Sequence, residues 1–106
     1  MENLFHTIPA DLPAELFDTL LETGSVRIER IVSRGHATPA GQWYDQDRHE
    51  WVLLLQGAAR LVFADGRELE LAPGDWLEIP ARQRHRVAQR ARQREPGSLV
   101  ARIQAY

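Results

Sequence analysis

The chain has 106 residues, which is enough for one domain with a hydrophobic core. Apolar residues make up 43% of the chain, charged residues make up 26%, and the net charge is −2. This balance is ordinary for a globular domain and excludes a global electrostatic attraction to nucleic acid or to a membrane. The absence of cysteine excludes disulfides, thiolate metal sites and a cysteine nucleophile.

The N-terminal residues do not resemble a targeting segment. The stretch from Met1 to Leu12 is acidic and interrupted by proline, unlike a signal peptide. No apolar run approaches the roughly 20 residues that a membrane helix needs. We therefore expect a cytoplasmic protein without a membrane partner.

Residues 1–24 are predicted to form an N-terminal segment with one short helix that packs on the outside of a β-domain. Asp11 is a suitable cap, Pro13 fits the first turn, and Gly24 fits the helix end. The apolar residues between them share one helical stripe: Leu12, Leu16, Phe17, Leu20 and Leu21.

From residue 25 to residue 106 the pattern changes to short strands separated by turns. Residues 25–33 alternate, with Val26 and Ile28 on one face and Arg27 and Glu29 on the other. The turn signals include Asp65–Gly66, a dipeptide suited to hairpins. Further strands are expected at residues 51–56, 58–63, 67–71, 76–79, 84–92 and 98–103. Seven short strands indicate an all-β fold, an antiparallel sandwich or barrel.

Four polar residues are candidates for the interior of this barrel. Glu50 shares a strand face with Val52 and Leu54, and a buried carboxylate needs a partner such as a metal, an arginine or a proton. His85 shares its face with Val87, and a neutral imidazole can bind a metal. The other two candidates are Tyr44 and Gln46.

These residues belong to a pattern that resembles a small, single-domain cupin. The second cupin motif, G-x5-P-x-G-x2-H-x3-N, is matched by Gly74, Pro80 and His85, with Arg82 in place of its second glycine and Gln89 in place of its asparagine. The ending of the first motif, E-x6-G, is matched by Glu50 and Gly57. The resemblance covers residues 25–103 and implies a jelly-roll barrel, the double-stranded β-helix.

The beginning of the first motif departs from the family pattern. Its two histidine positions are occupied by Tyr44 and Gln46, or by Trp43 and Asp45 with the longer spacer. The resemblance implies a divalent metal (zinc, iron, manganese or nickel) held by Gln46, Glu50 and His85, with Asp45 as the alternative to Gln46 as oxygen donor. Such a site is poorer in nitrogen ligands than a typical cupin centre.

The resemblance leaves two functions open, beside a third interpretation as a structural or interaction protein whose pocket has decayed. In the first, the barrel binds a small molecule around this metal and is an isomerase or dioxygenase of unknown substrate. Glu50 and His85 are then the catalytic residues, and Tyr44, Trp43 and Gln89 contact the substrate. In the second, the barrel is a metal-free binding or sensory module. Whether the chain is an enzyme stays open.

Surface features of the sequence predict partners of two kinds. Arginines from Arg82 to Arg94 form a basic stripe, which we interpret as a solvated strand face, so we expect no nucleic-acid partner. Trp51 and Trp76 are expected in the core or in an interface. Isolated cupin barrels commonly pair, so a homodimer is expected, with the N-terminal segment or an edge strand as the contact.

Overall fold

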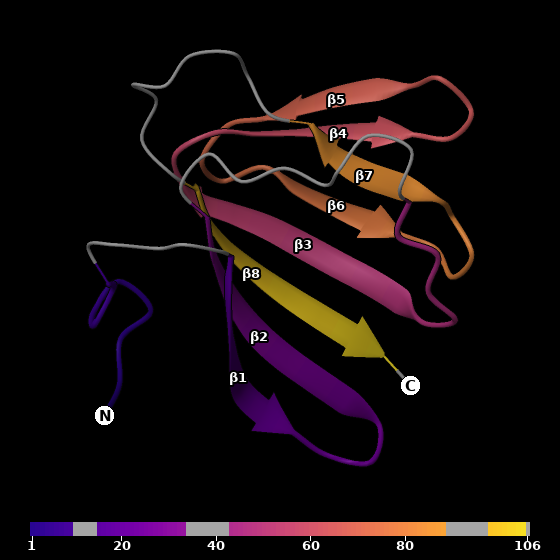
Figure 1. Cartoon of the computed structure of the whole chain (residues 1–106). Coiled ribbons are helices and arrows are strands. Elements are labelled where there is room, and N and C mark those ends of the chain that lie inside the picture. The colour runs from indigo at the N-terminus through magenta and orange to yellow at the C-terminus, as the bar shows by residue number, and fades with distance from the viewer. Residues whose placement is uncertain (10–14, 34–42, 89–97, 106) are drawn as a thin grey trace.

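Eight strands make up the regular structure of the described residues, which are 1–9, 15–33, 43–88 and 98–105 of a computed structural model (Figure 1). The strands are β1 (Leu16–Glu22), β2 (Val26–Ser33), β3 (His49–Gln56), β4 (Ala59–Phe63), β5 (Glu68–Leu71), β6 (Trp76–Ile79), β7 (His85–Ala88) and β8 (Ser98–Ala105). The all-β prediction is confirmed. Within the described ranges, no helix is long and apolar enough to span a membrane.

The strands form two antiparallel sheets. One sheet has five strands in the order β1-β2-β8-β3-β6, and the other has three in the order β5-β4-β7. Figure 1 shows the three-stranded sheet above the five-stranded one. The apolar core lies between them: Val52 and Ile79 come from the larger sheet, and Leu61 and Phe63 from the smaller.

The predicted helix at the N-terminus is wrong for the part of it that the structure describes. Residues 16–22 form strand β1, which pairs with β2 and contains a bulge between Thr19 and Leu21. Leu16 and Leu21 lie on one face of this strand, Phe17 lies on the other, and Leu20 falls within the bulge. Apolar residues on both faces of a bulged strand leave no simple alternation, so the same pattern matches a helical stripe. The expected cap and first turn, residues 11–14, lie outside the described residues.

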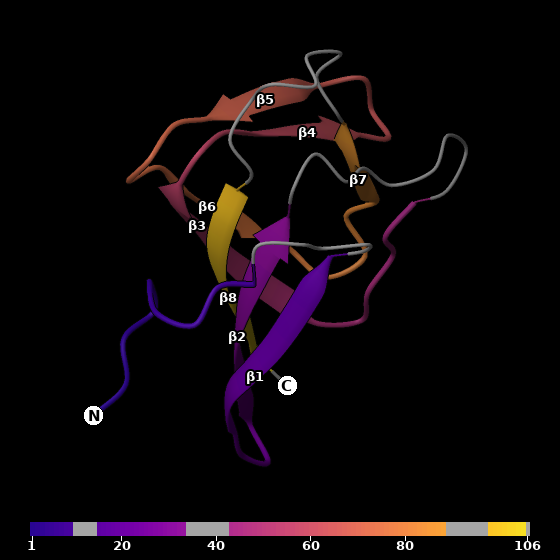
Figure 2. The same ribbon diagram turned by 60° about the vertical axis from the view of Figure 1, so that its left-hand side comes forward.

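Residues 1–9 lie against the outer face of the five-stranded sheet, on the left in Figure 2. Arg30 of β2 points to this face and donates hydrogen bonds to the backbone oxygens of Leu4, His6 and Thr7. Its guanidinium also pairs with Asp18 of β1 at 2.6 Å. The N-terminal residues are therefore held to the sheet by one buried arginine.

The hairpin between β4 and β5 turns at Asp65–Gly66, as predicted. Gly66 has φ of 96°, in the left-handed region that glycine adopts without strain. The backbone N–H of Arg67 donates to the Asp65 carboxylate at 3.0 Å and lowers the pKa of that carboxyl. This turn aligns β4 with β5 and thereby fixes the inward direction of Leu61 and Phe63.

Candidate functional site

Glu50 lies on the inner face of the five-stranded sheet, in line with Val52 and Leu54 along β3. It is only 3% exposed, and among the described residues its Oε1 atom has no hydrogen-bond partner. The opposite residue on β6 is the core residue Ile79. A buried carboxylate oxygen without a donor is costly, so this atom is suited to bind a ligand group or a cation.

A polar row continues from Glu50 across the sheet. Directly opposite residues of antiparallel strands lie on the same face. Glu50 is opposite Gln104 of β8, and Gln104 is opposite Arg27 of β2. The side chain of Gln104 is buried and donates to Oε1 of Gln46 at 2.5 Å. The hydrogen bond between Gln104 and Gln46 therefore connects this row to the segment that precedes β3.

A buried ion pair occupies the next row of the same face. Arg102 of β8 lies opposite Val52 of β3 and Glu29 of β2, and its guanidinium donates to Glu29 at 3.0 Å. The side chain of Glu29 is 5% exposed and that of Arg102 is 14% exposed. The same guanidinium lies 5.4 Å from the ring centre of Phe17 on β1. These contacts orient Arg102 from several directions.

His85 faces the same interior from the opposite sheet. It is buried, lies opposite Phe63 in the β4–β7 pair, and forms an isolated bridge with Tyr44. Its Nδ1 is 2.9 Å from the carbonyl oxygen of Gln83. A carbonyl only accepts, so in the neutral imidazole Nδ1 carries the proton and Nε2 carries the lone pair. This tautomer suits Nε2 for accepting a proton or binding a metal.

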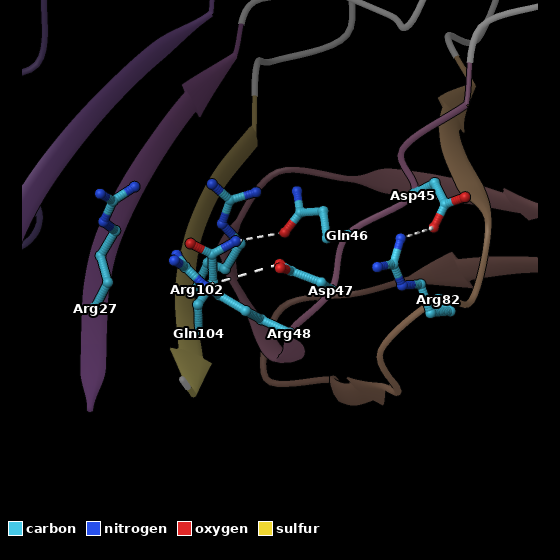
Figure 3. A pocket seen from close by; sticks show the side chains of 8 residues that line it. All are labelled: Arg27, Asp45, Gln46, Asp47, Arg48, Arg82, Arg102 and Gln104. Atoms are coloured by element: carbon cyan, nitrogen blue, oxygen red, sulfur yellow. Dashed lines mark hydrogen bonds and ion pairs between the residues drawn. The ribbon is translucent and has the colours of Figure 1, made fainter. Parts of the chain in front are cut away.

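A polar pocket of about 500 Å³ opens beside this row, at the end of the sheet where β3 begins and β8 ends (Figure 3). Four arginines and two aspartates contribute to its lining, together with the amides of Gln46 and Gln104. The charged lining residues are Arg27, Arg48, Arg82, Arg102, Asp45 and Asp47. The lining thus carries more positive than negative charge, although the chain as a whole is acidic.

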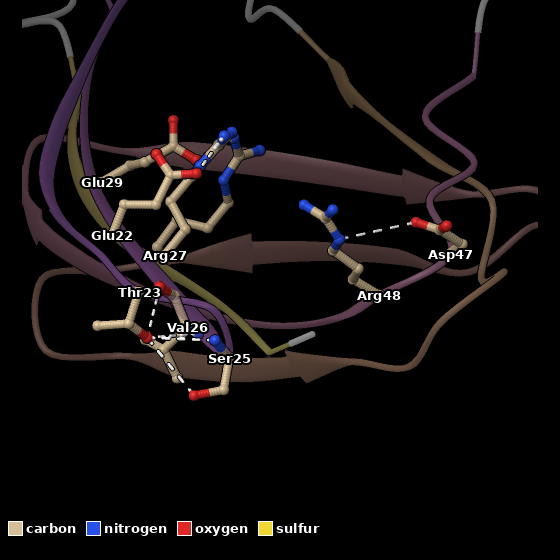
Figure 4. Close-up of polar contacts among 9 residues, drawn as sticks. Glu22, Thr23, Ser25, Val26, Arg27, Glu29, Asp47 and Arg48 are labelled. Atoms are coloured by element: carbon tan, nitrogen blue, oxygen red, sulfur yellow. Dashed lines mark hydrogen bonds and ion pairs between the residues drawn. The ribbon is translucent and has the colours of Figure 1, made fainter.

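The four arginines differ in how firmly carboxylates hold them. Arg27 pairs with Glu22 at 3.0 Å, as Figure 4 shows, and Arg102 pairs with Glu29 at the same distance. Arg48 lies 3.9 Å from Asp47, and Arg82 lies 3.7 Å from Asp45. These two separations exceed normal hydrogen-bond lengths. Both guanidiniums are also much more exposed than that of Arg102.

Of the site residues chosen from the sequence, Gln46 lines this pocket together with its alternative Asp45, and Glu50, His85 and Tyr44 lie outside its lining. Glu50 and His85 face one interior, Gln46 lines the pocket beside Gln104, and Tyr44 contacts His85 with ring centres 5.6 Å apart. Trp43 instead lies beside the guanidiniums of Arg84 and Arg86, and it does not line this pocket. Gln89 lies outside the described residues.

The sequence analysis missed the part of the site that β2 and β8 supply. Arg27, Glu29, Arg102 and Gln104 were not chosen as site residues, although Arg27 and Glu29 were placed on one strand face. Strand alternation groups residues by face without telling which face is inside. The alternation of polar and apolar residues could have located these groups in residues 98–105, where Arg102 and Gln104 alternate with Ala101 and Ile103.

A divalent metal requires several donor atoms at one point. Glu50 Oε1 and His85 Nε2 are two potential donors, but Oε1 of Gln46 already accepts from Gln104. Among the described residues, no three His, Asp or Glu side chains gather as a metal cluster. Catalytic metal centres usually have three protein ligands. The described residues therefore offer two free donors, fewer than a usual catalytic centre has, and Gln46 is a third only if it releases Gln104.

The comparisons with known proteins agree on the fold. Residues 32–101 match a family model described as a cupin domain. A solved structure from Ralstonia eutropha, provisionally assigned as a mannose-6-phosphate isomerase, is 39% identical, with a TM-score of 0.90 over 99% of this chain and 96% of that one. No curated protein sequence matches this chain.

Two more distant structures support the fold alone. A cupin superfamily protein from Desulfitobacterium hafniense is 23% identical, with a TM-score of 0.75 over 92% of this chain and 83% of that one. An RmlC-like cupin with a double-stranded β-helix from Methanocaldococcus jannaschii is 16% identical, with a TM-score of 0.72 over 93% and 86% of the two chains.

The buried pair of Glu29 and Arg102 yields a stability prediction. We expect Arg102→Met to lower the free energy of unfolding by about 3 kcal/mol, because Glu29 is left as an unpaired buried charge. The double variant Glu29→Leu/Arg102→Met should recover most of this loss. Urea denaturation followed by circular dichroism measures both.

The matched control is Arg60→Met, which removes an arginine from an exposed strand pair with Glu68. This variant should change the free energy of unfolding very little. Equal losses for Arg102→Met and Arg60→Met would show that the buried pair does not organise the inner face.

Proposed function

This chain belongs to the cupin family, and we propose that its barrel binds a small, negatively charged organic molecule. The observation that carries the proposal is the convergence of four arginines on one pocket beside the buried Glu50. Guanidinium groups bind carboxylates and phosphates through paired N–H donors. Gln46 and Gln104 line the pocket, and Glu50 lies opposite Gln104 in the next strand without lining it; all three carry groups that hydrogen-bond hydroxyls. Together they favour a ligand that carries both an anion and hydroxyl groups.

Arg82 supports this proposal through its backbone. Its φ is 67°, in the left-handed region, and it occupies the position at which the cupin motif has glycine. A side chain in this region costs roughly 1–2 kcal/mol. An arginine retained there at the edge of a pocket is consistent with a functional role for its guanidinium.

An isomerase acting on a sugar phosphate is the enzymatic form of this proposal. The Ralstonia eutropha relative carries a provisional assignment of that kind, and a sugar phosphate combines an anion with hydroxyl groups. Glu50 and His85 are side chains of the types that transfer protons in such reactions. In this mechanism the arginines hold the phosphate while Glu50 and His85 face the sugar carbons.

Binding of mannose 6-phosphate, compared with mannose, tests the ligand class. Isothermal titration calorimetry should show that the wild-type chain binds the phosphate more tightly than the neutral sugar. Arg82→Gln should weaken phosphate binding about 10-fold or more, as expected for one lost charged hydrogen bond, and leave mannose binding unchanged. Arg82→Gly should weaken binding equally without lowering the free energy of unfolding.

Arg84→Gln is the matched control, because Arg84 lies beside Trp43 and does not line the pocket. Equal effects of Arg82→Gln and Arg84→Gln, or equal affinity for mannose and its phosphate, would contradict an anion site at this pocket. Conversion of mannose 6-phosphate to its ketose, lost in Glu50→Gln, would establish the enzymatic form.

A divalent cation is the second candidate partner of Glu50. Two observations favour a cation. Oε1 of Glu50 has no partner among the described residues, and the hydrogen bond from Nδ1 of His85 to the Gln83 carbonyl leaves a lone pair on Nε2. Zinc, iron, manganese and nickel are the metals to test, with Gln46 as the further ligand. Such an ion would supply Lewis acidity to a bound ligand.

Metal content by mass spectrometry, after incubation with each ion and desalting, tests this candidate. About one equivalent per chain is expected for the wild type, with loss in both Glu50→Ala and His85→Ala. His49→Ala is the control, since His49 is exposed and its Nδ1 accepts from the backbone of Ala81. If the wild-type protein retained no metal, or the variants retained all of it, a cation bound by Glu50 and His85 would be excluded.

A further inference from the structure

The four arginines of the pocket follow the order of the strands along one end of the five-stranded sheet. Arg27 belongs to β2 and Arg102 to β8, whereas Arg48 directly precedes β3 and Arg82 follows β6. The strands β2, β8, β3 and β6 are neighbours in this order. The arginines are therefore spread across the width of the pocket, and Figure 3 shows Arg27 and Arg82 at its two sides.

The width of the sheet separates Arg27 from Arg82. Three strand spacings lie between β2 and β6, which places the backbones of these strands about 14 Å apart. A phosphate or carboxylate oxygen lies about 2.7–2.9 Å from the guanidinium nitrogen that donates to it. One anionic group could therefore contact both residues only if the two side chains extended toward each other.

The carboxylate partners of Arg27 and Arg102 hold these two side chains away from Arg82. Arg27 donates to Glu22 on β1, and Arg102 donates to Glu29 on β2. Each carboxylate is directly opposite its arginine in the sheet, on the side away from β6. Arg27 and Arg102, which we call the inner arginine pair, are thus separate from Arg82.

The inner arginine pair retains hydrogen-bonding capacity at the pocket wall. A guanidinium has five N–H donors, and Arg102 uses Nη2 for its contact with Glu29. The Nε atom of Arg102 is buried and has no hydrogen-bond partner among the residues that the structure describes. A buried N–H group without an acceptor costs free energy. An anionic oxygen of a ligand would satisfy this donor.

Groups that hydrogen-bond hydroxyls lie between the inner arginine pair and Arg82. Gln46 precedes β3, which is the strand between β8 and β6. Its side chain accepts from Gln104, and its backbone oxygen accepts from the backbone N–H of Arg82 at 2.7 Å. An amide both donates and accepts hydrogen bonds, as a hydroxyl does. The pocket wall therefore has guanidinium groups at both sides and amides between them.

We propose that the ligand of this pocket carries two anionic groups, one at each end of a carbon chain that bears hydroxyls. One anionic group binds Arg82, the other binds the inner arginine pair, and the hydroxyls contact Gln46 and Gln104. This inference rests on the proposed function, which requires one anionic group, and adds the second. Sugar bisphosphates and phosphorylated sugar acids share this chemistry.

Isothermal titration calorimetry at constant ionic strength tests the second anionic group with matched ligands. Mannose 1,6-bisphosphate should bind about 10-fold more tightly than mannose 6-phosphate, or better, as expected for one added charged hydrogen bond. Gluconate 6-phosphate, compared with glucose 6-phosphate, tests a carboxylate in place of the second phosphate. The pair of ligands with the larger gain identifies the second group.

Arg27→Gln tests whether the inner arginine pair provides this gain. Its ion pair with Glu22 is partly exposed, so the variant should remain folded by circular dichroism. The 10-fold advantage of the bisphosphate over the monophosphate should fall to about equal affinity. Arg60→Gln is the control, because it removes the same charge from an exposed pair with Glu68 outside the pocket. This control should keep the advantage.

Two results would overturn the second anionic group and leave the proposed function intact. The first is binding of mannose 6-phosphate with no gain from a second phosphate or a carboxylate. The second is an equal loss of the gain in Arg27→Gln and Arg60→Gln, because the gain would then come from the overall charge of the chain. If none of these phosphates bound, the proposed function itself would be wrong, and this inference with it.

Discussion

The burial of Glu50 in the core-facing row of β3 is the constraint on which the rest of the structure depends. A shift of β3 by one residue would turn Trp51 and Leu53 inward and place the carboxylate outside. With Glu50 inside, its opposite residue Gln104 is also inside, and so is Arg27 one strand further. The inner polar row, the pocket and the apolar outer face all follow from this one register.

The pocket and the outer face are therefore two results of the same alternation. On β2, Arg27 and Glu29 point inward, and Val26 and Ile28 point outward. A sheet that packs only one apolar face would place these residues the other way round. The reversed arrangement places charged groups on the inner face of the sheet and apolar residues on its outer face. The ligand proposed above would therefore lie against the charged face.

Most of the fold could be predicted from the sequence, and so could the inward direction of Glu50 and His85. Turn signals and alternation located seven of the strands, and the two motifs selected Glu50 and His85, which the structure buries. Strand β1 was predicted as a helix because it carries apolar residues on both faces and a bulge interrupts its alternation. The local sequence pattern could not distinguish a helix from a bulged strand without knowledge of the pairing with β2.

The remainder of the site depends on contacts between distant parts of the chain. Gln46 and Gln104 are 58 residues apart, and Glu29 and Arg102 are 73 apart, so no local spacing indicates that they meet. The inward direction of Arg27 likewise follows only from its place opposite Gln104. These contacts become visible once strand order is known.

If Glu50 is retained for a ligand at a cost to stability, the free energy of unfolding of Glu50→Gln tests this most directly. The substitution preserves size and removes a buried charge that has an unpartnered oxygen. We predict that the ligand-free variant is more stable than the wild type by about 1 kcal/mol. A variant that is less stable by a similar amount would contradict the account, because Glu50 would then be a structural residue already satisfied by the fold.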